Sequence, residues 1–482
     1  MATALRDRVR SSPRYRWWAL VVLLIGFFST GISVTLLTAV LPTIAREFDV
    51  GTNTVAWVVT GPMLVYGVLM PSMGKAGDLY GRKRVYLVGW AVSMAFTGLA
   101  AVSWSAGALI SFRLLAAAFG AATGPASMAL ILSAFPPEER VKAMGWWSFA
   151  GAGAPVIGLV VGGPLVDLVG WRWIFGVQPP LAIPGVLLAM WVLRADERHD
   201  EHPAFDVLGS VLLGLTMGAF LFGLNQTAAA GWGDLRVWLP LVISPMLGYA
   251  FVRVERRHPD PLIRFSYFKR REVAVPMTLI ALSHIPYMGT FFLSPFLLHD
   301  VLRYDNARTA LALVPRPLAN SLASATAGYV AVKLGERFSA VTGMGAMACG
   351  LVVLAEVGSG SSFGQVVVAL ILTGIGMGLA FPGLISTIAN SVSERDFGSI
   401  SAAQEMLMMV GMTLGMQGMQ TLQAARARSV GAAAGYRDAF LVGAALSALA
   451  TLLAFGVRSM HRSTPVPPTE SPESPYLAEP VS

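Results

Sequence analysis

The stretch GKAGDLYGRKRV, residues 74–85, places an aspartate and four cations in a short gap between two long apolar segments. A glycine at each end lets the backbone turn tightly and lets neighbouring helix ends approach closely. Asp78 can accept charge-assisted hydrogen bonds from Arg82, from Lys83 or from the N-terminus of a helix. A basic loop that only orients the chain explains the cations, but it gives the acid and the glycine spacing no role. We therefore expect a gate, an ion-paired loop that holds two parts of the molecule together in one state and releases them in another.

The rest of the chain has the composition of a protein dissolved in lipid. Of its 482 residues, 55% are hydrophobic and only 13% are charged, and the mean hydropathy is +0.63. Soluble proteins carry about a quarter charged residues, so lipid must surround most of this chain. The formal net charge of +8 therefore reflects membrane topology, and we expect no nucleic-acid partner. The single cysteine, Cys349, excludes a disulfide framework and a cysteine-based metal site.

Fourteen apolar segments are long enough to cross the hydrocarbon as helices, which takes about 20 residues each. They are 17–44, 54–74, 84–103, 106–134, 142–167, 172–193, 205–226, 236–254, 273–299, 308–332, 338–357, 364–391, 397–424 and 437–458. If the N-terminus is inside, the inner loops and tails carry 25 of the 35 Lys and Arg residues and the outer loops carry 8. This bias supports an even number of spans with both termini cytoplasmic. It also places the predicted gate at the cytoplasmic face, with the residues Gly74, Gly77, Asp78, Gly81, Arg82 and Lys83.

The chain repeats itself at an offset of about 254 residues. The matching landmarks are Pro42 with Pro295, Gly74 and Gly81 with Gly328 and Gly335, and EER at 138–140 with SER at 393–395. Parallel repeats of this kind build transporters whose substrate site lies between the repeats near the bilayer midplane. We therefore predict an all-α integral membrane protein with two six-helix bundles in a pseudo-twofold parallel repeat plus an inserted helix pair.

This repeat divides the chain into five parts. They are a cytoplasmic N-terminal arm (1–16), an N-terminal bundle (17–194), the inserted pair with its linkers (195–271), a C-terminal bundle (272–458) and a cytoplasmic tail (459–482). The tail is rich in proline, serine and glutamate, a composition typical of disorder.

The opening stretch resembles the signature loop of the major facilitator superfamily, G-x-L-A-D-R-x-G-R-K. The residues from Gly74 to Lys83 depart from it at Ala76, Gly77 and Leu79. The last of these changes removes one usual cation of the family, so the detailed ion-pair pattern differs here.

Two further stretches carry the same resemblance. SFRLLAAAFGAATGPAS in the fourth span resembles the R-x-x-Q-G-x-G helix of the family through Arg113 and Gly120, with Ala116 in place of the glutamine. GWRWIFGVQPP at 170–180 resembles the W-R-W-I-F segment of the fourteen-span drug:proton antiporter branch, with Gln178 where asparagine is common. The resemblance covers all fourteen spans and implies a secondary transporter that needs no cofactor and uses a proton gradient as its energy source.

The fifth span, GAGAPVIGLVVGG, resembles the antiporter helix of the family with its G-P-x-x-G-G core. Ala154, Gly158 and Gly162 form one stripe of small residues, along which another helix can pack closely. Pro155 frees a backbone carbonyl and favours a bend. These features suit a helix about which two bundles rock, although glycine is also common in ordinary membrane helices.

Four ionisable residues lie well inside the predicted spans, where an unpaired charge costs at least about 2–3 kcal/mol. Because burial disfavours the charged form of a carboxyl, Glu405 is a candidate proton carrier, and a structural pair with an arginine is the alternative. His284 titrates near neutral pH in water, so it can carry the proton, bind substrate or simply pack. Arg316 can bind an anionic group or balance Glu405, and Arg113 can pair with a carboxylate or with backbone carbonyls.

The first span lacks an acid that the antiporter branch usually carries in a pattern like L-D-x-T-x-x-N-x-A-L-P. Ser33 replaces the aspartate and Thr38 replaces the asparagine. An exporter of cationic drugs needs a buried carboxylate, so this change favours neutral, zwitterionic or lipid-like substrates. Span thirteen is rich in methionine, which suits adaptable binding surfaces but also fills cores. The candidate residues of the substrate cavity, or charge partners in it, are Arg113, Arg316, Ser33, Tyr66, Tyr287 and Met409.

The sequence thus predicts a monomeric, proton-coupled exporter of hydrophobic or amphipathic small molecules in a cell membrane, such as a bacterial inner membrane. Its partners are the substrate, protons and membrane lipids. A lipid translocator of the same fold is the alternative within transport, and an uptake carrier is third. An integral-membrane enzyme requires a tight polar constellation at one depth, whereas the six histidines here are dispersed and none has metal-ligand spacing.

Overall fold

The computed structural model describes residues 8, 10–12, 14–194, 206–258 and 261–458. Side chains within these ranges are not described at 30–40, 42, 52, 53, 56, 155–169, 225, 228–230, 306 and 307. Most of the expected N-terminal arm, the start of the linker after the first bundle and the tail 459–482 therefore lie outside the described residues.

Helices make up nearly all of the described chain. They are α2 (Tyr15–Glu47), α3 (Thr52–Tyr80), α4 (Arg82–Ala101), α5 (Ala106–Gly120), α6 (Thr123–Ala134), α7 (Arg140–Val169), α8 (Arg172–Gly176), α9 (Gln178–Val192), α10 (Val207–Ala230), α11 (Leu235–Glu255), α12 (Arg271–Asp300), α13 (Asn306–Leu313), α14 (Pro315–Leu334), α15 (Glu336–Ala355), α16 (Phe363–Ala389), α17 (Phe397–Val430) and α18 (Ala432–Ala454). Three short 3₁₀ turns, η1 (Pro137–Glu139), η2 (Tyr267–Lys269) and η3 (Glu394–Asp396), lie in the connections. The predicted all-α fold is therefore confirmed.

Each of the fourteen expected segments coincides with one helix or with two consecutive ones. Ten of them, counted over the described residues, are long and apolar enough to be candidate membrane spans. The expected segments outside this set fall on α2, α7, α13 with α14, and α17. Part of α2 and of α7 has undescribed side chains.

The helices α14 and α17 are less apolar because much of their surface faces protein and carries polar residues. Arg316, Asn320 and Ser324 are buried on α14, and Gln404 and Glu405 are buried on α17. A helix that lines an internal interface needs less hydrophobicity than one that faces lipid, so a threshold on hydropathy misses it.

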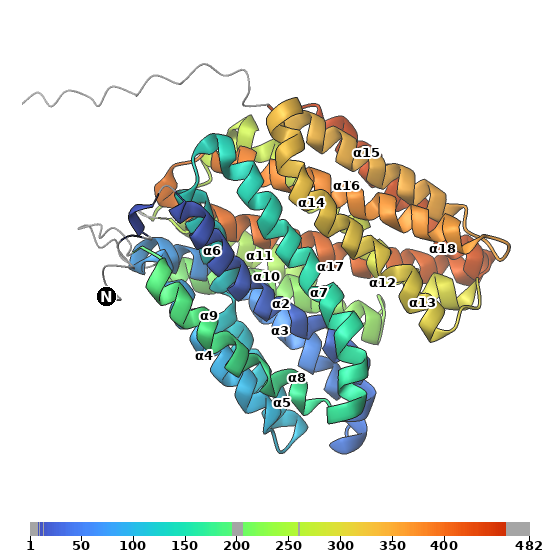
Figure 1. The fold of residues 1–482 in the computed structure, drawn as a ribbon. Helices are drawn as coiled ribbons and strands as arrows, with labels where there is room; N and C mark the ends of the chain where they lie inside the picture. Colours follow the sequence, from blue (N-terminus) through green and yellow to red (C-terminus); the bar gives the residue numbers. More distant parts are fainter. Residues whose placement is uncertain (1–7, 9, 13, 195–205, 259–260, 459–482) are drawn as a thin grey trace, which may run out of the picture.

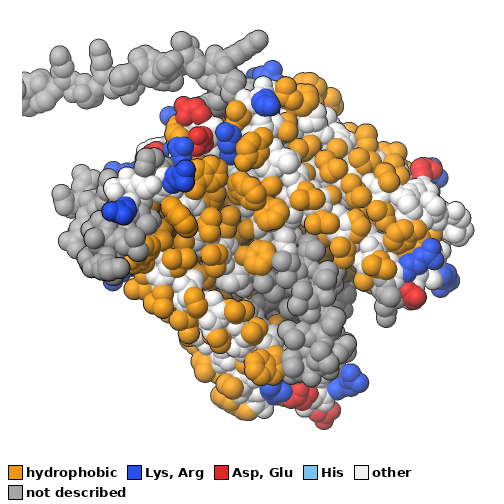
Figure 2. Space-filling model, viewed as in Figure 1, with side chains coloured by type: hydrophobic (Ala, Val, Ile, Leu, Met, Phe, Trp, Pro, Cys, Tyr) orange, Lys and Arg blue, Asp and Glu red, His pale blue; other side chains and the backbone are white. Residues whose placement is uncertain are grey.

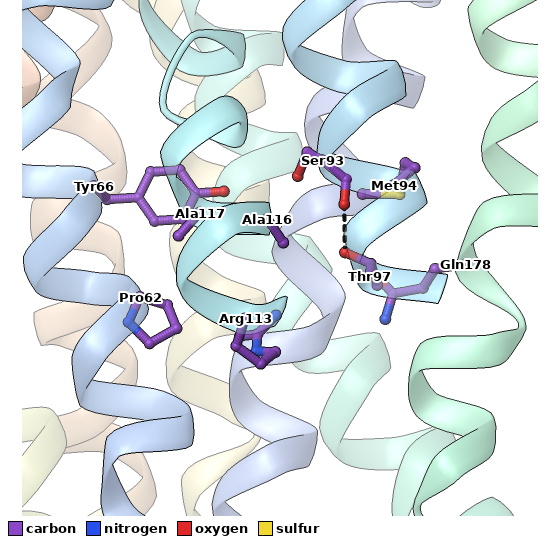
Figure 3. Close-up of a pocket in the computed structure, with 9 residues that line it drawn as sticks. All are labelled: Pro62, Tyr66, Ser93, Met94, Thr97, Arg113, Ala116, Ala117 and Gln178. Atoms are coloured by element: carbon purple, nitrogen blue, oxygen red, sulfur yellow. Dashed lines mark hydrogen bonds between the residues drawn. The ribbon is translucent and has the colours of Figure 1, made fainter. Parts of the chain in front are cut away.

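The helices gather into two groups with one helix pair beside them. Figure 1 shows α2–α9, in blue to green, on one side and α12–α18, in yellow to red, on the other. The two groups meet where α3 packs on α17, α7 on α14 and α6 on α17. Figure 2 shows a broad hydrophobic surface with charged side chains concentrated at its two ends, as expected for a protein in a bilayer.

In the pair α10 and α11, α10 packs on α3 and α17, beside the seam between the two groups, and α11 packs on α10. Two buried acids stand at the ends of this pair, Asp206 before α10 and Glu255 at the end of α11. Their exposed fractions are 3% and 1%. Asp206 caps α10 by accepting from the Gly209 amide at 2.7 Å, and Glu255 accepts from the Ile263 amide at 2.7 Å. The two side chains are within hydrogen-bonding range of each other. Because ionised carboxylates only accept, such a pair is stable when it holds one proton.

Glycines with positive φ separate two consecutive helix pairs at corresponding places in the repeat. Gly81 (φ 99°) ends α3 and Gly335 (φ 91°) ends α14, and the next helix starts immediately in each case. A side chain is disfavoured in this backbone conformation. The tight turn brings the end of α3 and the start of α4 to one point, where the predicted gate lies.

Candidate gate and transport site

Asp78 joins the two groups of helices at the expected cytoplasmic end. Its carboxylate accepts from Nε and Nη2 of Arg82, one turn further along, at 2.9 and 2.8 Å. It also accepts from the amides of Gly398 and Ser399 at 3.0 and 2.8 Å and from the Ser399 hydroxyl at 3.0 Å. Gly398 and Ser399 lie in the first turn of α17, so Asp78 occupies the positive end of that helix. A residue of the first group thus caps a helix of the second.

Two arginines surround this contact. Arg82 donates to the Ser133 hydroxyl at 2.7 Å and to the Glu394 carbonyl. Arg140, which is 5% exposed, donates to the Asn390 side chain at 2.9 Å and to the Glu394 carboxylate at 2.8 Å. Both guanidinium groups lie over the Phe397 ring, at 5.7 and 4.9 Å from its centroid. These residues and Asp78 form a connected set of contacts that we call the latch.

Asp396, the residue immediately before α17, is bound by the segment that follows α11. Tyr267 donates its hydroxyl to Asp396 at 2.6 Å, and the Arg264 guanidinium lies 3.4 Å from the same carboxylate. Burial, followed by the hydrogen bond to Asp396, raises the pKa of Tyr267. The hydroxyl therefore stays protonated and remains a donor to Asp396.

The glycines of the repeat mark close helix contacts in both halves. A Cβ at Gly74 would stand 2.5 Å from the Gly398 carbonyl oxygen on α17. A Cβ at Gly328 would stand 3.0 Å from the Val141 carbonyl oxygen at the start of α7. Contacts below 3.0 Å do not occur in real structures without movement, so these glycines let α3 meet α17 and α14 meet α7.

The other predicted gate residues lie in the same turn. Gly77 is buried and Gly81 takes the positive-φ position. Lys83 donates to the carbonyls of Met190 and Leu193 at the end of α9, at 3.1 and 2.5 Å. Its described contacts thus lie within the first group of helices.

Glu405 lies on α17 at the seam between the two groups. It is 3% exposed, and a Cβ at Gly124 of α6 would stand 2.5 and 2.8 Å from its two carboxylate oxygens. Its Oε1 is fully buried and has no hydrogen-bond partner. Within the part of the chain that the structure describes, Glu405 forms no ion pair, so the alternative of a structural pair with an arginine finds no partner there.

The hydroxyl of Tyr66 on α3 lies within electrostatic range of both Arg113 and Glu405. Tyr66 and Arg113 line a small cavity inside the first group of helices, together with Ser93, Thr97 and Gln178. Arg113 is 9% exposed, its Nε points at the Val58 carbonyl oxygen at 3.4 Å, and its guanidinium lies 5.5 Å from the Phe175 ring centroid. The structure thus brings two predicted site residues, Arg113 and Glu405, close to a third, Tyr66.

The remaining charged candidates lie inside the second group. His284 is 2% exposed, its Nδ1 lies 2.7 Å from the Ile280 carbonyl oxygen, and its ring contacts Phe381 edge to face at 5.2 Å. Arg316 is 2% exposed, donates to the Tyr287 carbonyl and stacks over the Tyr287 ring at 4.0 Å. These contacts are those of a packed histidine and of an arginine that pins α14 to α12.

Four predicted residues are placed only in outline. Ser33 on α2 and Pro155, Gly158 and Gly162 on α7 lie outside the residues whose side chains are described. Ala154 is fully buried. Met409 is partly buried on α17.

The sequence reasoning missed several residues of the latch: Ser133, Arg140, Asn390, Glu394 and Ser399. Arg140 and Glu394 had appeared only as landmarks of the repeat. The repeat could have indicated this contact. Two loops that match in a parallel repeat lie on the same side of the membrane and can meet at the axis that relates the repeats. Opposite charges in the two loops then indicate a contact.

A model of the Major Facilitator Superfamily matches residues 23–416 and, in a second match, residues 316–480. The chain belongs to the major facilitator superfamily. The family consists of transporters, so the chain is a multi-pass membrane transporter and not an enzyme.

The relatives narrow the branch of the family. The chain is 30% identical to puromycin resistance protein pur8 of Streptomyces alboniger, over 88% of this chain and 84% of that protein. It is 28% identical to the tetracenomycin C resistance and export protein of Streptomyces glaucescens, over 86% and 77%. It is 27% identical to multidrug export protein EmrB of Haemophilus influenzae, over 69% and 66%. These relatives confirm the predicted branch, the fourteen-span drug:proton antiporters.

Solved structures support the fold alone. The crystal structure of the human organic anion transporter MFSD10 (TETRAN) superposes with a TM-score of 0.69 at 15% identity, over 92% of this chain and all of that one. The proton:xylose symporter XylE superposes with a TM-score of 0.64 at 11% identity, over 91% and 94%. Sequence identity at this level carries no information about substrate.

Proposed function

We propose that the protein is a proton-coupled exporter of hydrophobic or amphipathic small molecules that works by alternating access in a bacterial inner membrane. In this proposal it has fourteen spans with both termini cytoplasmic. The bundles 17–194 and 272–458 move against each other as a monomer, and 195–271 carries the inserted pair.

The observation that carries the proposal is the position of Glu405. A buried carboxyl without a hydrogen-bond partner in the described chain is far more stable neutral than charged. Because it lies against Gly124 of the opposite group, its surroundings change when the two groups separate. Opening the seam hydrates the carboxyl and favours release of its proton, and closing the seam favours uptake. Such a group couples a proton to a rocking motion.

The latch supplies the second element of alternating access. The hydrogen bonds that Asp78 accepts from the first turn of α17, and those that Arg140 donates to Asn390 and Glu394, cross the seam at one end of the molecule. These bonds can form only when the two groups are close there. The structure therefore represents a state closed at the expected cytoplasmic end. Release of Asp78 from α17 allows that end to open.

The proposed class of substrate rests on the relatives and on the side chains of α17. The names of pur8 and of the Streptomyces glaucescens protein connect them to resistance against puromycin and tetracenomycin C. Partly buried methionines on α17, such as Met409, suit bulky apolar cargo. Puromycin and the neutral dye Nile red are therefore suitable probes.

The test uses purified protein in proteoliposomes with an imposed proton gradient. We expect Glu405→Gln to abolish gradient-driven movement of both probes, because the amide cannot carry a proton. Glu255→Gln is the matched control, since it replaces another buried carboxyl that belongs to the inserted helix pair, and it should transport normally. His284→Gln should also transport normally.

Gradient-driven transport that survives in Glu405→Gln but is lost in His284→Gln would move proton coupling to His284. A labelled phosphatidylethanolamine in the same vesicles separates the exporter from the lipid translocator. Movement of the lipid without movement of puromycin or Nile red would overturn the export proposal.

A further inference from the structure

The cavity inside the first group of helices has features that proton-coupled export does not require. It is lined from α3, α4, α5 and α9, so it lies within one bundle rather than between the two. Its free volume of about 20 Å³ is far below the roughly 300–1,000 Å³ of pockets that hold drug-sized ligands, and it exceeds the roughly 10–15 Å³ that one water molecule needs. It has room for a small ion or for one polar group of a larger molecule.

The charge in this cavity is positive and lacks a counter-charge. Arg113 is only 9% exposed. No carboxylate among the residues with described side chains forms an ion pair with it, and no acid lines the cavity. Its described polar contact is one long approach of Nε to the Val58 carbonyl oxygen, at 3.4 Å. A buried cation without a partner is costly, and an anion is the ligand that removes this cost.

Two hydroxyl groups are placed beside it as further donors. A Cβ at Gly120 would stand 2.5 Å from the Tyr66 hydroxyl oxygen and 2.9 Å from that of Ser93. Glycine at this position therefore leaves room for both hydroxyls at the cavity wall. Neither hydroxyl donates a hydrogen bond to any residue that the structure describes, so both remain available to a ligand. Gln178 and Thr97 complete a polar lining that contains no acid.

We propose that this cavity binds a small anion or the anionic group of a ligand, with Arg113 as its charge partner and Tyr66 and Ser93 as hydrogen-bond donors. A halide, a carboxylate or a phenolate satisfies the three donors. A cation or a neutral apolar group leaves the buried Arg113 with the Phe175 ring and the Val58 carbonyl but without a counter-charge. Glu405 does not line this cavity, so the proposal does not require that Glu405 carries the proton.

Binding is tested on the purified full chain in detergent, with thermal unfolding as the readout. Sodium chloride and sodium formate are compared with sodium gluconate, which is too large for the cavity, at equal ionic strength and pH. We expect chloride or formate to raise the melting temperature in a saturable way, because a ligand that binds only the folded state stabilises it. Glu405→Gln should keep this response, which separates the anion site from proton coupling.

Variants at the site identify the donors. Arg113→Gln should lose the saturable response and Arg113→Lys should keep a weaker one. Tyr66→Phe and Ser93→Ala keep the charge and should each weaken binding about tenfold, the effect of one lost hydrogen bond to a charged group. Arg316→Gln is the matched control, a buried arginine in the other bundle, and should respond as the wild type does.

Transport distinguishes a free anion from a group of the cargo. Rhodamine 110 carries a free carboxylate and rhodamine 123 is its methyl ester. If the cargo supplies the anion, Arg113→Gln should reduce transport of the acid far more than that of the ester. If a solution anion fills the site, replacing chloride by gluconate should slow transport of both dyes in the wild type but not in Arg113→Gln.

The proposal is overturned if chloride, formate and rhodamine 110 all behave identically in the wild type and in Arg113→Gln. It is also overturned if Tyr66→Phe and Ser93→Ala bind chloride and formate as the wild type does. If Arg113→Gln does not fold, Arg113→Lys and the two hydroxyl variants decide the question, because they retain the buried charge or its neighbours.

Discussion

Replacing Asp78 by alanine should open the cytoplasmic end of the transporter. Of the hydrogen bonds that Asp78 accepts, those from the Gly398 amide, the Ser399 amide and the Ser399 hydroxyl cross the seam, at 3.0, 2.8 and 3.0 Å. Those from Arg82 stay within the first bundle and persist in both states. Only the crossing bonds therefore bias the equilibrium between closed and open.

The size of the effect follows from these three bonds. Hydrogen bonds to a charged group contribute about 1.5–3 kcal/mol each, but bonds that share one carboxylate are not additive and water replaces them when the latch opens. We take about 3 kcal/mol for the set, which is roughly a 150-fold change in the equilibrium. Asp78→Asn keeps one acceptor oxygen and loses the charge, so we expect about half the free energy, or roughly a tenfold change.

Distances between spin labels measure this equilibrium directly. Arg84, at the start of α4, and Lys333, near the end of α14, are exposed positions on opposite bundles. Cysteines at both positions, in a chain with Cys349→Ser, take the labels. In liposomes the ratio of long to short distances should rise about 150-fold in Asp78→Ala relative to the parent, and the Asp78→Asn ratio should lie between the two.

The matched control is Asp305→Asn. Asp305 caps α13 by accepting from the Arg308 amide at 2.7 Å, and both residues belong to the second bundle. Its loss costs about 1 kcal/mol of stability and should leave the distance ratio unchanged. The reasoning fails if Asp78→Ala folds, shows the parental distances and matches the control, because the crossing bonds would then not favour the closed state.

Other substitutions test neighbouring parts of the structure. Arg140→Gln should destabilise the closed state by about 2–3 kcal/mol, since it removes charged hydrogen bonds to Asn390 and Glu394. In the double variant with Asp78→Ala, the change in the distance ratio should be less than the sum of the two single changes. Full additivity would mean that the two contacts are independent. Gly74→Ala should destabilise the closed state by about 1–3 kcal/mol, because its Cβ overlaps the Gly398 carbonyl; a parental distance ratio would contradict this. Glu255→Gln should change the free energy of unfolding by less than about 0.5 kcal/mol, because the amide can donate to Asp206 as the shared proton does. Glu255→Ala should lower it by about 3 kcal/mol. Equal melting temperatures for the two variants would exclude a shared proton.

Much of the helical framework was predictable because lipid imposes simple rules. A span must be long, apolar and hydrogen-bonded within itself, so the fourteen segments could be read from composition, and each coincides with a helix. The gate stretch was also accessible, since an acid between two glycines in a basic loop is a local pattern. Asp78 does contact a helix N-terminus, one of the partners that its chemistry allowed. Its role in gating stays a prediction.

The interior of the site was less accessible because it depends on helix rotation. The sequence left Arg316 with two possible roles, binding an anionic group or balancing Glu405. The structure turns Glu405 toward Gly124 of the opposite bundle and Arg316 toward Tyr287 of its own. The sequence spacing cannot distinguish these cases, because α14 and α17 are polar on more than one face. Similarly, nothing local to Arg140 indicated that it would bind Glu394, which is 254 residues away.

The repeat relates the α3–α17 seam to the α14–α7 seam, but only the α3–α17 seam contains Asp78. Gly74 and Gly328 occupy corresponding positions and both bring a helix close to the start of its neighbour in the other bundle. At the offset of 254 residues, however, the counterpart of Asp78 is Val332. The seam between α14 and α7 therefore has the close packing without a buried acid on a helix end. The charged contact found there is Lys142 over the Tyr329 ring, at 5.7 Å from its centroid, and such a contact tolerates rotation better than hydrogen bonds do. The α3–α17 seam, in contrast, has hydrogen bonds that are either made or broken. We infer that the α14–α7 seam serves as the pivot and that the α3–α17 seam sets the closed state, so Gly328→Ala should slow the exchange between states more than it changes their populations.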